Sequence, residues 1–73
     1  MIYLEPRSTF DRAIIDISND RVIYDYDLII DVMMIDFDWD YLTAVEWYCA
    51  NIEPLISDVG LMIRDEHENF DSM

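Results

Sequence analysis

Five consecutive residues in the middle of the chain, Asp36-Phe37-Asp38-Trp39-Asp40, place carboxylates at alternate positions. Alternate carboxylates are the opening ligands of a calcium-binding loop, which also needs a glycine at its sixth position and a glutamate at its twelfth. The chain has Tyr41 and Trp47 at those two positions. The sequence therefore predicts no metal site, and the three aspartates are interpreted as turn and helix-cap residues.

The residue types that serve most often as nucleophiles and as acid–base catalysts are nearly absent. His67 is the only histidine, and no nucleophile lies beside it in the sequence. Cys49 is the only cysteine, and its apolar neighbours and lack of a nearby base indicate a buried, inert thiol. Among 17 acidic residues, no pair stands out for divided acid and base roles. We therefore predict that the protein is not an enzyme and that it binds no cofactor.

Acidic charge dominates the composition. The 73 residues include 17 acidic side chains, four arginines and no lysine, which gives a formal net charge of −13. Between Arg21 and Arg64 the chain has no positive side chain, although many carboxylates lie there. This balance excludes direct binding of nucleic acid and attraction to acidic membrane surfaces. It favours a basic protein as the partner.

A block of acids in the middle of the chain is the candidate binding surface. Alternate residues of an extended segment, such as Asp25 and Asp27, lie about 7 Å apart on one side, and Asp27 and Asp31 would lie about 6 Å apart along a helix. Carboxylates at such spacings resemble a phosphate track. The predicted partner-binding residues are Asp25, Asp27, Asp31, Asp36, Asp38, Asp40, Glu46 and Trp47.

Trp47 belongs to this set for a different reason. If Ala44, Val45 and Tyr48 face the core of a helical segment, Trp47 turns largely outward. An exposed tryptophan beside acids is typical of a protein interface. The Trp47 face is therefore the contact surface of the alternative hypothesis, in which the chain is a small acidic adaptor or a self-associating protein such as a homodimer.

The elements that carry these residues indicate a small α+β domain. With 53% hydrophobic residues the chain is too apolar for a disordered acidic tail, and its length allows one domain. Ser18-Asn19-Asp20 is typical of a turn between two strands, so residues 10 to 24 predict a β-hairpin. A short strand over residues 61 to 63 is expected to close the domain.

Two helices are predicted between the hairpin and the closing strand. Asp27 is the expected cap of the first, which runs over residues 28 to 35, although its β-branched residues leave a strand as the alternative. Asp40 is the expected cap of the second helix, which covers residues 41 to 53 and is limited by Pro54. The residues at helical spacing that should face the core are Ala44, Val45, Tyr48 and Ile52. The predicted order is ββααβ in one domain over residues 1–65, followed by a flexible acidic tail over residues 66–73.

Short segments of the chain resemble small acidic proteins from phages and prophages that are functionally uncharacterised. The similar segments are Phe10 to Ile15, Tyr24 to Asp27, and Ala44 to Trp47 followed by Asn51. This resemblance implies a viral or prophage context, and compact acidic phage proteins include anti-restriction and anti-CRISPR inhibitors of host defence. It assigns no functional residues.

These observations predict an inhibitor that mimics nucleic acid. Its partner would be a basic nucleic-acid-binding protein, such as a nuclease or an effector complex, in the cytoplasm of a host cell. A single cysteine, the lack of a charged-then-apolar leader and the lack of a long apolar run agree with a cytoplasmic protein. Crowding of like charges also predicts carboxylate pKa values that are raised in the folded chain.

Overall fold

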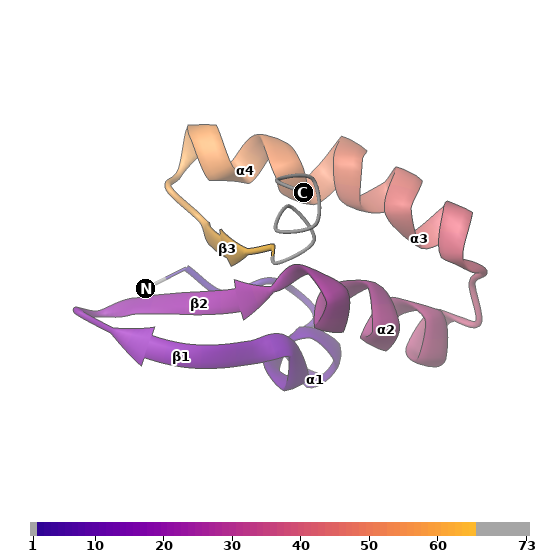
Figure 1. Ribbon diagram of the computed structural model, residues 1–73, viewed down its shortest axis with the longest axis horizontal. Helices are drawn as coiled ribbons and strands as arrows, with labels where there is room; N and C mark the ends of the chain where they lie inside the picture. Colours follow the sequence, from indigo (N-terminus) through magenta and orange to yellow (C-terminus); the bar gives the residue numbers. More distant parts are fainter. Residues whose placement is uncertain (1, 66–73) are drawn as a thin grey trace, which may run out of the picture.

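The computed structural model describes residues 2–65 and has the predicted ββααβ order (Figure 1). Residues 7–13 form two short helical turns that the sequence did not predict, so the first strand begins at Ile14 and not at Phe10 as expected. The elements are α1 (Arg7–Phe10), the 3₁₀ turn η1 (Asp11–Ala13), β1 (Ile14–Ser18), β2 (Arg21–Asp25), α2 (Tyr26–Phe37), α3 (Tyr41–Trp47), the π turn η2 (Tyr48–Ile52), α4 (Glu53–Asp58) and β3 (Met62–Arg64). The predicted tail over residues 66–73 lies outside the described residues.

The hairpin turns through the two residues that the sequence indicated. Ser18 pairs with Arg21, so Asn19 and Asp20 form a two-residue loop. Both have positive φ values, 54° and 63°. Two consecutive positive φ values are those of a type I′ turn, whose twist matches that of paired strands and which Asn and Asp tolerate well. The local sequence therefore explains where β1 ends and β2 begins.

Within residues 2–65 the strands form one sheet of order β1-β2-β3, in which β2 pairs antiparallel with β1 and parallel with β3. Parallel strands need a crossover connection, because a tight turn can join only antiparallel neighbours. The helices α2, α3 and α4 form this crossover. Figure 1 shows α3 lying across from α2, and α4 lying beside β3. None of the helices among the described residues combines the length and the apolar character that crossing a membrane requires.

Helix α2 begins two residues earlier than predicted. The Asp25 carboxylate accepts a hydrogen bond from the Leu28 backbone N–H at 3.1 Å, so Asp25 and not Asp27 is the N-cap. Asp27 lies in the first turn, where negative charge interacts favourably with the helix dipole. The segment is a helix rather than a strand, and it ends at Asp38, which has the left-handed φ of 58°.

The second predicted helix is confirmed and extends beyond its expected end. Asp40 caps it by accepting from the Thr43 N–H at 2.9 Å. Pro54 does not end the helical path, which continues through α4 to Asp58. Proline has no N–H and its ring crowds the carbonyl four residues earlier, and the chain adapts by widening the preceding turn into the π turn η2. The Asn51 side-chain Nδ2 donates to the Trp47 carbonyl at 3.1 Å beside this turn.

The core collects side chains from every layer of the fold. Ala44, Tyr48 and Ile52 are buried as the helical spacing predicted, and Val45 is half-buried against them. The other buried apolar residues are Leu4, Phe10, Ala13, Val22, Tyr24, Ile29, Ile30, Val32, Met33 and Leu61. Tyr24 on the central strand is fully buried, and its hydroxyl accepts a hydrogen bond from the Leu4 N–H at 2.8 Å. This bond fixes the N-terminal segment to the sheet.

Replacing Tyr24 with phenylalanine tests the importance of that bond. Tyr24→Phe leaves the buried Leu4 N–H without its acceptor, so the free energy of unfolding should fall by about 1–3 kcal/mol. Urea denaturation measures the change. Tyr48→Phe is a matched control, because within residues 2–65 the Tyr48 hydroxyl makes no hydrogen bond. A loss of about 0.5 kcal/mol or less is expected for this variant. Equal losses in both variants would contradict the role assigned to Tyr24.

The position of the α2 cap gives a second stability prediction. Asp25→Ala should lower the free energy of unfolding by about 1 kcal/mol, because the Leu28 N–H loses its side-chain acceptor. Asp25→Asn removes the same charge but keeps an oxygen acceptor, so it should cost much less. If both variants lose the same stability in urea denaturation, charge rather than capping explains the effect.

Candidate functional site

Negative charge covers the helical half of the molecule. Residues 22 to 63, which include all of α2, α3, η2 and α4, contain no Lys, Arg or His. Most of the acids in this stretch are exposed: Asp27, Asp31, Asp36, Asp38, Asp40, Glu46, Glu53 and Asp58. The four arginines lie in α1, η1, β2 and β3. The fold therefore separates a helical half with charge of one sign from a hairpin half with charge of both signs.

Asp36 is not an uncompensated member of the acidic block, contrary to the sequence-based expectation. Its carboxylate accepts a hydrogen bond from the Thr9 hydroxyl at 2.7 Å and forms an ion pair with Arg12. Both partners lie more than 20 residues earlier in the chain, so sequence proximity could not reveal them. These interactions join the end of α2 to α1 and η1.

Asp25 and Asp40 also have structural roles, because each caps a helix. The pKa of Asp36 is lowered by the hydrogen bonds from Thr9 and Arg12, and the pKa of Asp40 is lowered by hydrogen bonds from Thr43. For these two groups the expectation of raised pKa values is wrong. Their contribution to stability is present above the unfolded pKa and is lost as the pH falls through the lowered folded pKa.

The three aspartates that resemble the start of a calcium loop do not converge. Asp36 binds Thr9 and Arg12, Asp38 ends α2 in the left-handed conformation, and Asp40 caps α3. Among residues 2–65, no three His, Cys, Asp or Glu side chains come together in a way that could hold a metal ion. The interpretation as turn and cap residues holds for Asp38 and Asp40 but not for Asp36, which joins α2 to α1 and η1.

Trp47 does not turn outward as predicted. Its ring stacks on Phe10, with centroids 6.3 Å apart and planes at 14°, and lies 6.1 Å from Trp39. Phe37 completes this aromatic cluster through contacts with Phe10 and Trp39. Trp47 is consequently half-buried against the core. The most exposed large apolar side chains are instead Ile35 and Leu42, at 72% and 68%.

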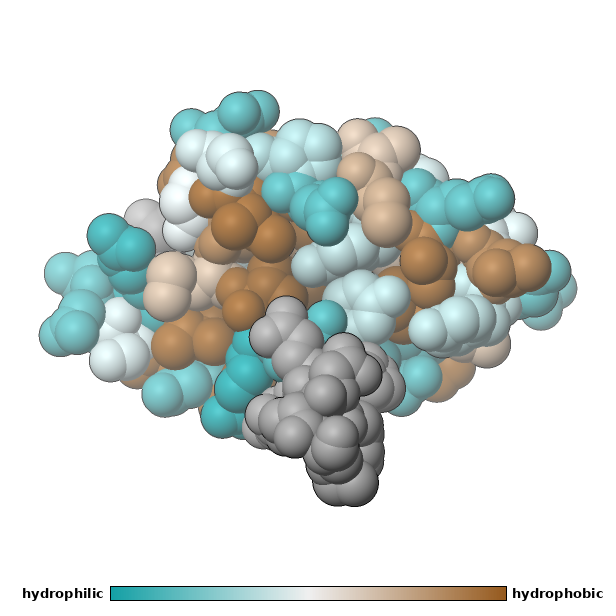
Figure 2. Space-filling model, turned by 45° about the horizontal axis from the view of Figure 1, so that its top comes forward, coloured by the Kyte–Doolittle hydropathy of each residue, from teal (hydrophilic) through white to brown (hydrophobic). Residues whose placement is uncertain are grey.

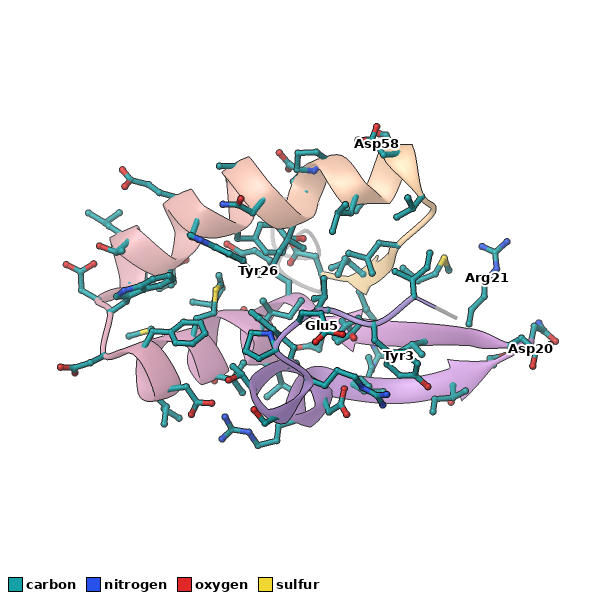
Figure 3. The ribbon with its side chains drawn as sticks, turned by 180° about the vertical axis from the view of Figure 1, so that it is seen from behind. Tyr3, Glu5, Asp20, Arg21, Tyr26 and Asp58 are labelled. Atoms are coloured by element: carbon teal, nitrogen blue, oxygen red, sulfur yellow. The ribbon has the colours of Figure 1, made fainter. Side chains whose placement is uncertain are left out.

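A pocket that sequence reasoning missed lies between the helical path and the end of the sheet. It has a volume of about 350 Å³ and is lined by Tyr26, Tyr48, Cys49, Glu53, Ile56, Ile63 and Asp65. Residues from α2, η2, α4 and β3 meet there, so no local sequence pattern could have indicated it. Figure 3 shows Tyr26 in the space between the sheet and the α3–α4 path. Cys49 is exposed, so the prediction of a buried thiol is wrong.

The two tyrosines of this pocket are held against each other. Their rings meet edge to face, with centroids 4.8 Å apart and planes at 90°. Burial is the main cause that raises the pKa of Tyr26 to about 12, and interactions with Tyr41 add to it. Burial likewise raises the pKa of Tyr48 to about 12, with the nearby charges of Glu53 and Asp65 adding to it. Both phenols therefore stay protonated well above neutral pH.

A second depression, of about 220 Å³, lies at the other end of the sheet. It is lined by Ile2, by residues 20–22 at the hairpin tip and by residues 59–62 before and within β3. Arg21 and Asp20 stand at the tip (Figure 3), and Arg21 Nη1 approaches the Met62 sulfur at 3.7 Å. Apolar side chains gather in two groups on the face drawn in Figure 2, with more hydrophilic side chains between and around them. The mixed lining of this depression favours no particular class of ligand.

The raised tyrosine pKa values predict a loss of stability in alkali. Groups whose pKa is raised on folding contribute stability that is fully present below the unfolded pKa of 10.0 and is lost as the pH rises through about 12. Urea denaturation at several pH values between 10 and 12 measures the loss. The double variant Tyr26→Phe with Tyr48→Phe should lose less stability over this range than the parent. An identical pH dependence in both would contradict the assignment.

Comparison with known proteins identifies no relative of this chain. No protein-family model matches it, and no curated protein and no solved structure is significantly similar to it. The resemblance to small acidic phage proteins therefore stays an expectation. The evidence on function comes from the chain's own charge, packing and pocket chemistry.

Proposed function

We propose that this protein inhibits a nucleic-acid-handling protein by occupying its basic groove as an acidic mimic of nucleic acid. The observation that carries the proposal is the helical half, in which exposed carboxylates occur on every helix from α2 to α4 without a basic residue between positions 22 and 63. A groove that binds phosphates through Arg and Lys binds ordered carboxylates by the same charge-assisted hydrogen bonds. Partners of this kind include nucleases and effector complexes of host defence.

The packing supports a rigid arrangement of these charges. The aromatic cluster joins α1, α2, the loop over residues 38–40 and α3, and the caps at Asp25 and Asp40 fix the helix starts. Carboxylates one helical turn apart, such as Asp27 and Asp31, lie about 6 Å apart along the axis. A pre-organised charged surface loses little conformational entropy on binding, which favours affinity.

The acids of the proposed surface divide into two groups. Asp25, Asp36 and Asp40 stabilise the fold through hydrogen bonds and also contribute charge. Asp31, Asp38 and Glu46 are exposed, and their substitution leaves the cap and ion-pair interactions intact. The second group is therefore the better target for mutation.

Self-association or an adaptor role through Trp47 has less support. Trp47 packs on Phe10 and Trp39 and offers only part of its surface. A net charge of −13 also opposes contact between two copies at low ionic strength.

Capture from a bacterial lysate tests the proposal. The immobilised protein is exposed to a nuclease-treated lysate, and bound proteins are eluted with duplex DNA. A nucleic-acid-binding protein should elute, and its affinity for the chain should fall steeply with added salt. Elution by salt but not by DNA would argue against mimicry.

Variants of the chain then locate the surface on the captured partner. The combined change Asp31→Asn, Asp38→Asn and Glu46→Gln should weaken binding about tenfold or more without unfolding the domain. The control variant carries Glu5→Gln, Asp16→Asn and Asp20→Asn, which remove the same charge from the N-terminal segment and the hairpin. Its affinity should stay within about twofold of the parent. Equal losses in both variants would show that net charge alone, and not the helical surface, determines binding.

A further inference from the structure

The pocket beside Tyr26 and Tyr48 combines three kinds of surface. The two phenol rings form aromatic walls, Ile56 and Ile63 supply aliphatic surface, and Glu53 supplies a carboxylate. Asp65 adds a second carboxylate at the end of β3. Among the described residues that line it, none is basic.

The two carboxylates lie close to the two phenol groups. The charge of Glu53 raises the pKa of Tyr48, and the charge of Asp65 raises the pKa of both Tyr26 and Tyr48. Such effects require the charges to lie near the phenols. The pocket therefore presents aromatic rings and negative charge together, and an anionic ligand would be repelled from it.

We propose that this pocket receives an arginine side chain of the basic partner. A guanidinium group is planar, stacks on aromatic rings and forms directed hydrogen bonds with carboxylates. Its three-carbon stem can lie along Ile56 and Ile63. The volume of about 350 Å³ is near the lower end for small-molecule sites, which suits one long side chain. The inference rests on the proposed function and deepens it, because a buried arginine is a common anchor of protein interfaces.

Titration of the intact protein with N-acetyl-arginine amide tests the pocket directly. Methyl NMR signals of Ile56 and Ile63 should shift in a saturable way, while those of Ile35 and Ile17, which are exposed elsewhere, should not. The citrulline analogue has nearly the same shape without the charge and should cause no saturable shift. The lysine analogue should bind more weakly, because an ammonium group is more strongly hydrated and cannot stack as guanidinium does.

A matched pair of glutamate variants assigns the charge contribution. Glu53→Gln should weaken arginine-amide binding about two- to fivefold, as expected for a partly exposed ion pair. Glu5→Gln removes an exposed glutamate outside the pocket and should leave the affinity unchanged. Equal effects of the two substitutions would overturn the assignment of the arginine to this pocket.

Cys49 supplies a second, independent readout. It is the only cysteine of the chain, it is exposed, and it lines the pocket. Saturating arginine amide should slow its alkylation by a bulky maleimide, and the citrulline analogue should not. An unchanged alkylation rate together with absent methyl shifts would overturn the proposal.

The outcomes separate this inference from the proposed function. If the captured partner binds through Asp31, Asp38 and Glu46 while arginine amide leaves the NMR signals of the pocket unchanged, the pocket inference is wrong. The proposal that the protein mimics nucleic acid is then retained. If arginine amide binds the pocket but the variant changed at Asp31, Asp38 and Glu46 keeps full affinity for the partner, the proposal of nucleic-acid mimicry is wrong. The pocket then remains a site for cationic side chains.

Discussion

Parallel pairing of β2 with β3 is the constraint on which the rest of the structure depends. Parallel strands cannot be joined by a tight turn, so the chain between them must leave the sheet, cross and return. The helices over residues 26–58 form that crossover. Because this segment carries acids and no basic residue, the topology gathers negative charge into one half of the molecule. The uneven distribution of charge on the surface is thus a consequence of the helical crossover between β2 and β3.

Concentrating like charges opposes folding, and the structure offsets this cost in two ways. A core that reaches from Leu4 to Leu61 buries apolar side chains, each of which contributes about 1.5–3 kcal/mol when fully buried. Asp25, Asp36 and Asp40 are bound by backbone N–H groups or by Thr9 and Arg12, so their charges are stabilised locally. The remaining exposed carboxylates repel one another across high-dielectric solvent, where each interaction is small.

The aromatic cluster includes Phe37 at the end of α2, whereas the tyrosine pair includes Tyr26 at the start of α2. The aromatic cluster packs the connection between α2 and α3 against α1 through Phe10, Phe37, Trp39 and Trp47. The Tyr26–Tyr48 pair leaves a pocket open at the surface. A small domain with one rigid aromatic contact and one open aromatic pocket can present both a charged surface and an anchoring site.

The sequence by itself determined the local features of this protein. Asn19 and Asp20 favour the type I′ turn, Asp40 caps its helix, and Ala44, Tyr48 and Ile52 share a buried face. Each of these depends on residues within a turn or two of one another, which is the range over which backbone propensity and side-chain periodicity act. The order ββααβ and the acidic character followed from the same information.

Tertiary structure decided the features that join distant segments. Asp25, and not Asp27, caps α2: it is the last residue of β2, where it pairs with Arg64 of β3, and the helix begins directly after it. Asp36 is compensated by Thr9 and Arg12, and Trp47 is half-buried on Phe10. The pocket likewise exists only where four elements meet. Contacts between residues far apart in the chain follow from the packing of whole elements, and local sequence patterns carry no record of them.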